Sequence, residues 1–363
     1  MDFSGLRIGF VPMSDVQMHP FDLRNFIYYA RKRKISFEIA KFGEEYDVIV
    51  LSPRADVSLW SRYQGKARLI YLIVDAYLAV SPLDMKGSLR GLAKYIGGEH
   101  KNLKLNYSSA IREMCLRADA VVCTTLEQKK DIQEYCNNIH IILDFNSHIV
   151  RETKLNYKAG KCINLIWEGQ AASIKGFTQI KKPLLALREK YPIALHIITD
   201  LERGRYMEKF KKISVLDDLR RIFGDSYLPN TSGGNGSFVY LYQWNLEMLS
   251  RIITGADIAI IPLDLRDPLM CGKPENKLIL FWRMGMPSVV SSIPAYERVM
   301  TECGLDLCCK SDSQWLAKLE ELIVDQTKRE SVAVKAKAFA DRYYSEEEYL
   351  KKWDQLFQSV LDK

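Results

Sequence analysis

The sequence Ala256-Asp-Ile-Ala-Ile-Ile-Pro-Leu-Asp264 leads through a short loop to Gly272-Lys-Pro-Glu-Asn-Lys277 and then to Gly285-Met-Pro-Ser-Val-Val290. The first and last parts are apolar and β-branched, which predicts a strand in each, and residues 278–284 suit a helix between them. The three parts therefore predict a βαβ unit. Its polar loop follows the first strand and opens the helix, where unpaired backbone N–H groups attract anions. We expect a phosphate to bind in this loop.

The same alternation of strand and helix extends over the whole chain. In the first half the predicted strands span 7–11, 47–51, 68–74, 118–124 and 139–143, and the predicted helices span 22–34, 110–116 and 127–135. In the second half the strands span 162–167, 193–198 and 238–242, the helices span 178–189 and 246–254, and the charged segment 201–223 is predicted to be helical. Such alternation is typical of a mostly parallel sheet with helices on both faces.

A polar, basic segment at 151–161 separates the two series and marks a domain boundary. We therefore expect an α/β fold with two Rossmann-like domains, the first over residues 1–155 and the second over 156–340. Residues 341–363 are predicted to form a terminal helix, because Ser345-Glu-Glu-Glu348 fits a capping box and apolar residues follow at helical spacing. Packing of this helix back on the first domain is the expected way to bury its apolar face.

The composition excludes several classes of protein. A chain of 363 residues with 47% hydrophobic and 27% charged residues is globular, and its net charge of +7 is spread too evenly for a nucleic-acid-binding stripe. No apolar run reaches the length of about 18 residues that a membrane span needs, and the start of the chain lacks the features of a signal peptide. The eight cysteines include no Cys-x-x-Cys pair, so we expect reduced thiols in a cytoplasmic protein and no metal site.

A second phosphate-binding candidate is Gly169-Gln-Ala-Ala-Ser-Ile-Lys175-Gly176, which follows a predicted strand and precedes a helix. Gly169 lets backbone N–H groups approach a phosphate, and Lys175 near the helix start can neutralise its charge without a metal. The alternative interpretation is an ordinary βα turn with a surface lysine. Neither a Gly-x-Gly-x-x-Gly fingerprint nor a Walker loop is present, which disfavours the common dinucleotide and P-loop sites.

The loop of the opening βαβ unit carries Lys273, Glu275, Asn276 and Lys277. Two lysines at a helix start can hold a diphosphate, and a nearby carboxylate can accept hydrogen bonds from ribose or sugar hydroxyls. A solvated helix start would be polar as well. Two lysine-bearing βα loops in one domain favour a bound ligand over this alternative.

These motifs together resemble the donor-binding half of GT-B glycosyltransferases, closest to glycosyltransferase family 4, and Ala118-Asp-Ala-Val-Val-Cys-Thr-Thr-Leu-Glu127 resembles part of the acceptor half. The resemblance implies two domains facing each other across a cleft and the transfer of a sugar with retention of anomeric configuration. It also implies that the nucleotide-sugar donor binds the second domain, at Gly169, Gln170, Lys175, Gly272, Lys273, Glu275, Asn276 and Lys277. Because lysines and helix N-terminal amides can stabilise the charge on the departing diphosphate, we expect no metal or other cofactor.

The sequence departs from the family pattern at the donor site. Gln170 stands where the family has an arginine that pairs with the lysine on the donor diphosphate, and Gly272 and Leu280 stand where the family has two carboxylates. The usual ribose contact is therefore missing from its usual position. Glu275, at a shifted position, is the expected substitute.

Catalytic candidates are Lys175 and, in the first domain, Asp75, which follows a predicted strand. Asp75 can accept a proton from an acceptor hydroxyl or bond to the transferred sugar. A turn or capping aspartate is the equally supported alternative, and related enzymes often carry a histidine in this region. Asp15 and His19, in the loop after the first strand, are further candidates on the acceptor side.

The basic run Arg31-Lys-Arg-Lys34 ends a predicted helix, where cations oppose the helix dipole. Since the family often acts on lipid-linked acceptors, contact of this run with an anionic membrane at the inner face is an alternative interpretation. The predicted function is glycosyl transfer from a nucleotide sugar to a glycan or lipid-linked acceptor, in polysaccharide or glycoconjugate biosynthesis. A nucleotide-sugar epimerase of the same fold and a non-catalytic protein that binds sugar nucleotides or other proteins are the two competing hypotheses.

Overall fold

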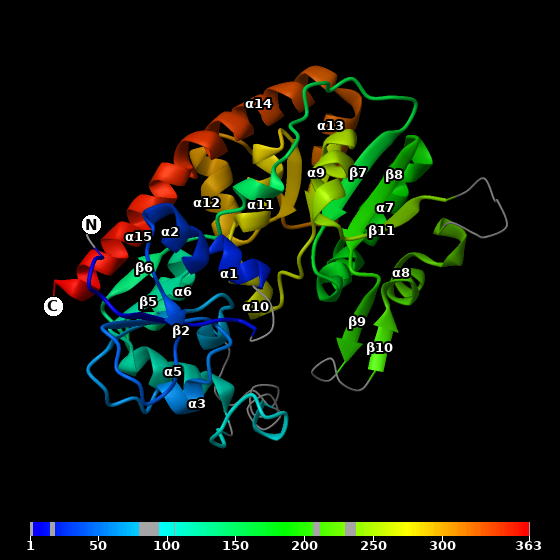
Figure 1. Cartoon of the computed structure of the whole chain (residues 1–363). Helices are drawn as coiled ribbons and strands as arrows, with labels where there is room; N and C mark the ends of the chain where they lie inside the picture. Colours follow the sequence, from blue (N-terminus) through cyan, green and yellow to red (C-terminus); the bar gives the residue numbers. More distant parts are fainter. Residues whose placement is uncertain are drawn as a thin grey trace. The chain divides into compact units, whose positions relative to one another are not determined.

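In the computed structural model, the residues described are 3–14, 19–79, 94–104, 106–205, 211–228 and 237–362. The chain divides into two compact units (Figure 1). Unit 1 contains Met1–Phe145, Gly272–Pro274 and Ser345–Lys363, and unit 2 contains Asn146–Cys271 and Glu275–Tyr344.

Unit 1 is built on a six-stranded sheet in the order β2-β1-β3-β4-β5-β6, in which all neighbouring strands are parallel. Its strands are β1 (Ile8–Val11), β2 (Glu38–Ile39), β3 (Val48–Leu51), β4 (Arg68–Leu72), β5 (Ala120–Cys123) and β6 (Ile139–Ile141). Its helices are α1 (Pro20–Arg24), α2 (Phe26–Arg33), α3 (Val57–Trp60), the 3₁₀ turn η1 (Tyr77–Ala79), α5 (Tyr107–Arg117), α6 (Leu126–Ile132) and α15 (Glu346–Leu361). The predicted alternation of strands and helices is confirmed.

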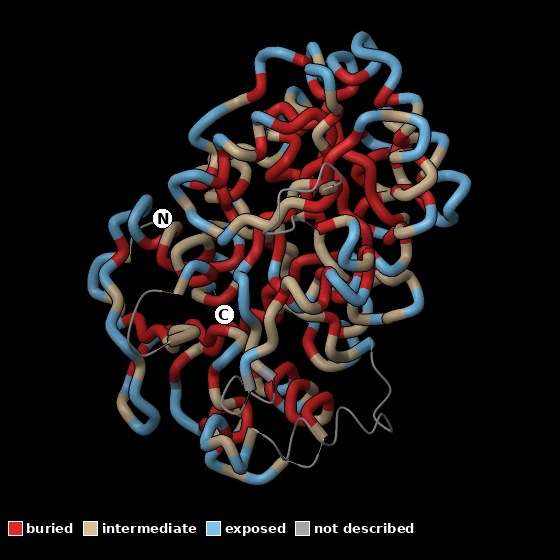
Figure 2. Tube along the Cα trace, turned by 90° about the vertical axis from the view of Figure 1, so that its right-hand side faces the viewer, coloured by how far each residue is buried: buried red, intermediate tan, exposed pale blue. Residues whose placement is uncertain are grey.

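Both faces of this sheet are buried. Successive residues of β3 belong to different hydrophobic clusters: Ile49 packs with the residues of α3 and α5, whereas Val48 and Val50 pack with those of α2 and α15. A strand that is buried on both faces reads as a continuous apolar run, which is why these strands were recognisable in the sequence. Figure 2 shows such buried segments as the red parts of the trace.

The terminal helix α15 is part of unit 1 and covers one face of its sheet, where it lies alongside β5 and β6 (Figure 1). Its apolar stripe consists of buried Tyr349, Trp353, Leu356, Phe357 and Val360. The Ser345 side chain accepts a hydrogen bond from the backbone N–H of Glu348, as the predicted capping box requires.

The basic run at the end of α2 bonds to this same helix. Lys32 pairs with Glu346, and the Arg33 guanidinium donates to Asp354 at 2.5 and 3.0 Å. Lys32 and Arg33 therefore have carboxylate partners within unit 1. These contacts give the run a structural role, and contact with a membrane stays a prediction.

The predicted helix over 22–34 is interrupted at Asn25, whose backbone departs from helical geometry. The interruption frees backbone carbonyls that would otherwise accept hydrogen bonds within the helix. The Tyr349 hydroxyl donates to the carbonyl of Asn25 at 2.8 Å, and the backbone N–H of Phe145 donates to the carbonyl of Arg24 at 2.9 Å. The break is thus compensated by α15, a tertiary contact that local periodicity does not contain.

Unit 2 has a second six-stranded parallel sheet, in the order β11-β8-β7-β12-β13-β14. Its strands are β7 (Ile163–Glu168), β8 (Ile193–Thr199), β11 (Val239–Gln243), β12 (Ile258–Ile261), β13 (Ser288–Ser291) and β14 (Cys308–Cys309). The 3₁₀ turns are η2 (Ser147–Ile149), η3 (Ala171–Gly176) and η4 (Asp225–Tyr227), and the helices are α7 (Phe177–Lys190), α8 (Val215–Phe223), α9 (Leu246–Gly255), α10 (Pro268–Cys271), α11 (Asn276–Arg283), α12 (Pro294–Glu302), α13 (Asp312–Val324) and α14 (Gln326–Tyr343). The βαβ unit predicted from the opening sequence corresponds to β12, α11 and β13.

The prediction of a helical segment over 201–223 is wrong for its first half. An antiparallel hairpin of β9 (Glu202–Arg205) and β10 (Lys211–Ser214) precedes α8 (Figure 1). The strand sequences are charged and lack the alternation that marks a half-buried strand, so only the pairing itself reveals them. Arg203 donates to Asp218 of α8 at 2.9 Å, which ties the hairpin to the helix that follows.

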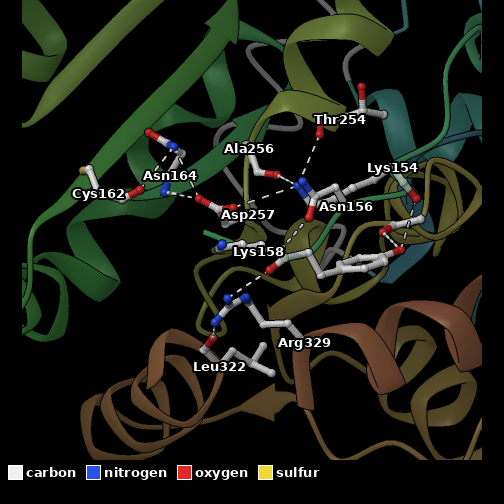
Figure 3. A network of polar contacts seen from close by, with 12 residues as sticks. Lys154, Asn156, Lys158, Cys162, Asn164, Thr254, Ala256, Asp257, Leu322 and Arg329 are labelled. Atoms are coloured by element: carbon white, nitrogen blue, oxygen red, sulfur yellow. Dashed lines mark hydrogen bonds and ion pairs between the residues drawn. The ribbon is translucent and has the colours of Figure 1, made fainter. Parts of the chain in front are cut away.

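The polar segment 151–161, which the sequence predicts to mark a domain boundary, is held on unit 2 by buried polar contacts (Figure 3). The Lys154 ammonium donates to the carbonyl of Ala256 at 2.6 Å and lies 3.9 Å from a carboxylate oxygen of Asp257. The other Asp257 oxygen accepts from the backbone N–H of Asn164 at 2.8 Å, and Arg329 donates to the carbonyl of Tyr157 at 3.0 Å. Burial lowers the pKa of Lys154, so these partners offset the cost of a desolvated cation.

Candidate functional site

The strand order of unit 2 identifies where its sheet can bind a ligand. The first three strands along the chain, β7, β8 and β11, follow one another toward one edge of the sheet, and the next three, β12, β13 and β14, follow one another toward the opposite edge. The strand order therefore reverses between β7 and β12. Open α/β sheets bind ligands outside the carboxyl ends of the two strands that flank such a switch point. The loops after β7 and β12 are the two loops that the sequence singled out. The topology thus brings both predicted phosphate-binding loops to one edge of the sheet.

Lys277 and Gly169 connect these loops directly. A Cβ atom on Gly169 would lie 2.3 Å from the Lys277 Nζ and 2.8 Å from the Trp167 ring, so the ammonium rests against the glycine backbone. The same Nζ lies 4.8 Å from the centroid of the Trp167 ring, which is a cation–π distance. The backbone N–H of Gly169 donates to the carbonyl of Ile198 at 3.1 Å and holds the start of the loop on the sheet. A positive charge therefore lies at the first glycine of the predicted phosphate loop.

The rest of this loop forms the 3₁₀ turn η3, which runs straight into α7. Gln170 precedes the turn and is exposed, and Lys175 lies in its last turn with an exposed side chain. A Cβ atom on Gly176 would lie 2.2 Å from the backbone carbonyl oxygen of Pro262, directly after β12. The two glycines of the motif thus have separate reasons to be glycine: Gly169 leaves room for Lys277, and Gly176 leaves room for the backbone of the neighbouring strand.

Replacing Gly176 by alanine should destabilise the chain by roughly 1 to 3 kcal/mol, because the new methyl group overlaps a backbone atom that cannot rotate away. Gly176 has a helical φ of −55°, so the added side chain meets a steric obstacle and no dihedral strain. Gly160→Ala is the matched control, since no atom lies within 4 Å of a Cβ built there. Urea unfolding of the two variants measures the difference. Equal midpoints would show that the two loops do not pack as described.

The second predicted loop is divided between the two units. Gly272 and Lys273 are grouped with unit 1, whereas Glu275, Asn276 and Lys277 belong to unit 2. Asn276 is the first residue of α11, and its buried Oδ1 accepts no hydrogen bond from the described residues. The structure therefore associates Lys277 with the loop after β7.

Glu275 has a partner inside unit 2. Its side chain is buried and accepts a hydrogen bond from the Tyr344 hydroxyl at 3.0 Å, which links the start of α11 to the end of α14. Leu280, at a position where the family resemblance implies a carboxylate, is buried in the hydrophobic core of unit 2. These environments argue against a ribose contact from either residue.

Two residues that the sequence did not single out lie at the same edge of the sheet. Glu168 ends β7 directly before Gly169, and Trp244 follows β11. The Trp244 indole N–H donates to a carboxylate oxygen of Glu168 at 3.1 Å. The one signal in the sequence was the position of Glu168 immediately before the glycine loop.

Unit 1 also has a switch point, between β1 and β3, because β2 lies on the far side of β1. His19 follows β1 and caps α1, where its Nδ1 accepts from the backbone N–H of Phe21 at 3.1 Å. Burial, together with the nearby cations Arg54 and Arg24, lowers the pKa of His19, so its neutral form is favoured. Asp15 lies outside the described residues.

Asp75 follows β4, the strand next to this switch point, and its side chain is half-buried. One carboxylate oxygen accepts from the Tyr77 hydroxyl at 3.0 Å. The buried Gln128 side chain donates to the carbonyl of Val74 at 2.7 Å and fixes the backbone just before the aspartate. Asp75 is thus held in place at the carboxyl end of the sheet, as a functional residue or a turn residue would be.

Among the described residues, no group of three or more His, Cys, Asp or Glu side chains is placed to hold a metal ion. All eight cysteines are free thiols. In the part of the chain that the structure covers, no helix has both the length and the apolar character to cross a membrane. Metal independence remains a prediction.

No protein-family model and no curated protein matches the sequence. Solved structures do match. A mutant of TarM from S. aureus, in complex with fondaparinux, alpha-GlcNAc-glycerol and UDP, is similar with a TM-score of 0.58 and 13% identity, over 85% of this chain and 55% of the TarM chain. Sucrose-phosphate synthase from Thermosynechococcus elongatus has a TM-score of 0.58 and 13% identity, over 87% of this chain and 74% of that chain.

The E. coli trehalose-6-phosphate synthase bound with UDP-2-fluoro glucose has a TM-score of 0.53 and 13% identity, over 88% of this chain and 74% of that chain. The match covers 55% of the TarM chain, so this chain spans about half the length of that protein. Likeness at this identity shows the fold, which is that of the GT-B glycosyltransferases with two Rossmann-like domains. The fold class predicted from the sequence is confirmed.

Proposed function

We propose that this protein is a glycosyltransferase that moves a sugar from a nucleotide-sugar donor to a glycan or lipid-linked acceptor. The observation that carries the proposal is the contact between the Lys277 ammonium and the backbone of Gly169 at the switch point of unit 2. It combines a cation, a glycine-lined backbone and the carboxyl ends of parallel strands, which together suit a diphosphate. The similar structures, solved with UDP or UDP-2-fluoro glucose, support the same class of ligand.

The chemistry follows from the charges. Transfer of the sugar leaves a nucleoside diphosphate, and its developing negative charge accounts for much of the barrier. Lys277 against Gly169 and the exposed Lys175 at the end of η3 are the cations proposed to stabilise that charge, so no metal is required. Gln170 adds no charge, and the site therefore has one cation fewer than the family pattern. Retention of anomeric configuration is proposed from the family resemblance.

Unit 1 is proposed to bind the acceptor. His19 after β1 and Asp75 after β4 lie at the carboxyl ends of its parallel strands, where α/β sheets present ligand-binding residues. The lowered pKa of His19 favours a neutral imidazole, and because its Nδ1 already accepts the backbone N–H of Phe21, the ring proton is on Nε2, which can donate a hydrogen bond to an acceptor oxygen. Asp75 is the candidate base, and among the described residues the Tyr77 hydroxyl bonds to one of its carboxylate oxygens.

A thermal-shift screen with UDP, GDP, ADP and their sugar conjugates tests the donor site. A ligand present at about 100 times its dissociation constant should add about 2.7 kcal/mol of stability. Lys175→Ala should reduce the shift and slow transfer by roughly tenfold to a hundredfold, since it removes a charge-assisted contact. Lys182→Ala is the control, an exposed lysine on the following helix. The absence of any shift, or equal behaviour of the two variants, would count against this site.

Turnover then separates glycosyl transfer from the two competing hypotheses. Formation of a nucleoside diphosphate that depends on an added glycan or lipid-linked acceptor supports the proposal. Isomerisation of the donor sugar without an acceptor would identify an epimerase. Tight binding with no turnover on any acceptor would identify a non-catalytic binding protein, the interpretation that Gln170 and Leu280 favour.

A further inference from the structure

Glu168 and Trp244 form a polar bridge at the ligand-binding edge of unit 2. Their strands, β7 and β11, are separated by β8, and the end of β8 is Thr199. The backbone N–H of Trp244 donates to the carbonyl of Thr199 at 2.9 Å, while its indole N–H reaches Glu168 at 3.1 Å. The hydrogen bond between Trp244 and Glu168 therefore passes over the end of β8. It joins the last residue of β7 to the first residue after β11.

The bridge places a carboxylate next to the predicted phosphate loop. Glu168 directly precedes Gly169, the residue against which the Lys277 ammonium rests. Glu168 is half-buried, and no described residue besides Trp244 donates a hydrogen bond to its carboxylate. An ionised carboxylate has about four acceptor positions, so one indole N–H leaves most of its capacity unused. A carboxylate repels phosphate, and its natural ligands are therefore the hydroxyl groups of a neighbouring part of the same molecule.

We propose that Glu168 accepts hydrogen bonds from the ribose hydroxyls of the donor nucleotide, with Trp244 as the residue that positions it; this inference rests on the proposed function. It provides the ribose contact that α11 lacks. Leu280 is buried among apolar side chains, and Glu275 is bonded to Tyr344. Glu168 lies on a different strand, one residue from the phosphate loop, and remains partly accessible. In this proposal, the ribose is bound at the end of β7 and not by α11, the helix after β12.

Discrimination between ribose and dideoxyribose tests this assignment. Isothermal titration of the full chain with UDP, GDP and ADP, each beside its 2′,3′-dideoxy counterpart, gives the preference for the ribose hydroxyls. The wild-type chain should prefer the ribonucleotide by roughly tenfold to a hundredfold, because hydrogen bonds to a charged acceptor are the strong ones. Glu168→Gln should weaken the binding of the ribonucleotide and leave the affinity for the dideoxynucleotide unchanged or higher. The preference for the ribonucleotide should then fall to about threefold or less.

The controls separate recognition from stability. Trp244→Phe retains an aromatic ring without the N–H donor and should lower the preference to an intermediate value. Glu189→Gln, an exposed glutamate on α7, should change neither the preference nor the melting temperature. An unchanged preference in a folded Glu168→Gln variant overturns the inference and leaves the proposed function intact. Failure of every nucleoside diphosphate to bind the wild-type chain overturns both.

Discussion

Replacing Trp353 by alanine should lower the free energy of unfolding by about 3 to 5 kcal/mol, the cost of removing a large aromatic side chain from a packed core. Trp353 is fully buried in α15 and stacks on Tyr29 of α2 with ring centroids 5.3 Å apart. Phe26 and Phe357 lie against the same ring at 6.0 and 6.3 Å. Since this cluster covers one face of the unit 1 sheet, its loss should destabilise unit 1 as a whole.

Urea unfolding followed by circular dichroism measures the effect, with the transition of unit 1 identified by limited proteolysis. Gln355→Ala is the matched control, because Gln355 is exposed on the same helix and surface substitutions usually change stability by less than about 0.5 kcal/mol. If the Trp353 variant unfolds at the wild-type midpoint, α15 does not contribute to the core of unit 1. A single transition that shifts in proportion would indicate that the two units unfold together.

Lys277→Met should weaken the binding of a nucleoside diphosphate by roughly tenfold to more than a hundredfold, the equivalent of one charge-assisted contact of about 1.5 to 3 kcal/mol. Methionine keeps an unbranched apolar chain that can pack on the Trp167 ring, so the substitution removes the charge more than the packing. Because the diphosphate carries more charge as it leaves, the rate of transfer should fall at least as much as the affinity.

Titration with UDP, GDP and ADP gives the affinity, and release of the nucleoside diphosphate gives the rate. Lys182→Met, on the exposed face of α7, controls for the general effect of removing one positive charge. The melting temperatures of both variants show whether the fold is retained. Wild-type affinity in the Lys277 variant would place the diphosphate elsewhere and would remove the principal support for the proposed function.

Most of the fold was predictable because the chain uses buried parallel strands. Residues of β3 such as Ile49 and Val50 face opposite hydrophobic clusters, so the strand is apolar throughout and stands out from the amphipathic helices around it. The errors occur where local pattern is weak. The hairpin of β9 and β10 is charged, and the helix break at Asn25 depends on a hydrogen bond from Tyr349, more than 300 residues later.

The candidate site was predictable in its parts and not in its assembly. Glycines and lysines after strands are visible in the sequence, and these features identified Gly169, Lys175 and Lys277 as phosphate-binding candidates. Glu275 was equally plausible in the sequence, but its burial against Tyr344 gives it a structural partner. Glu168 was not selected, because nothing in the sequence connects it with Trp244, which lies 76 positions later.

The sequence by itself determined the two series of parallel strands, the glycine loop after β7 and the polar start of α11, because each depends on residues close together in the chain. Only the tertiary structure decided that β7 and β12 are neighbours at the point where the strand order reverses. That arrangement sets the Lys277 ammonium against Gly169, and it places Glu168 beside them. The physical reason is that a diphosphate site needs charges and backbone groups from separate loops, and strand order, which local periodicity does not encode, determines which loops meet.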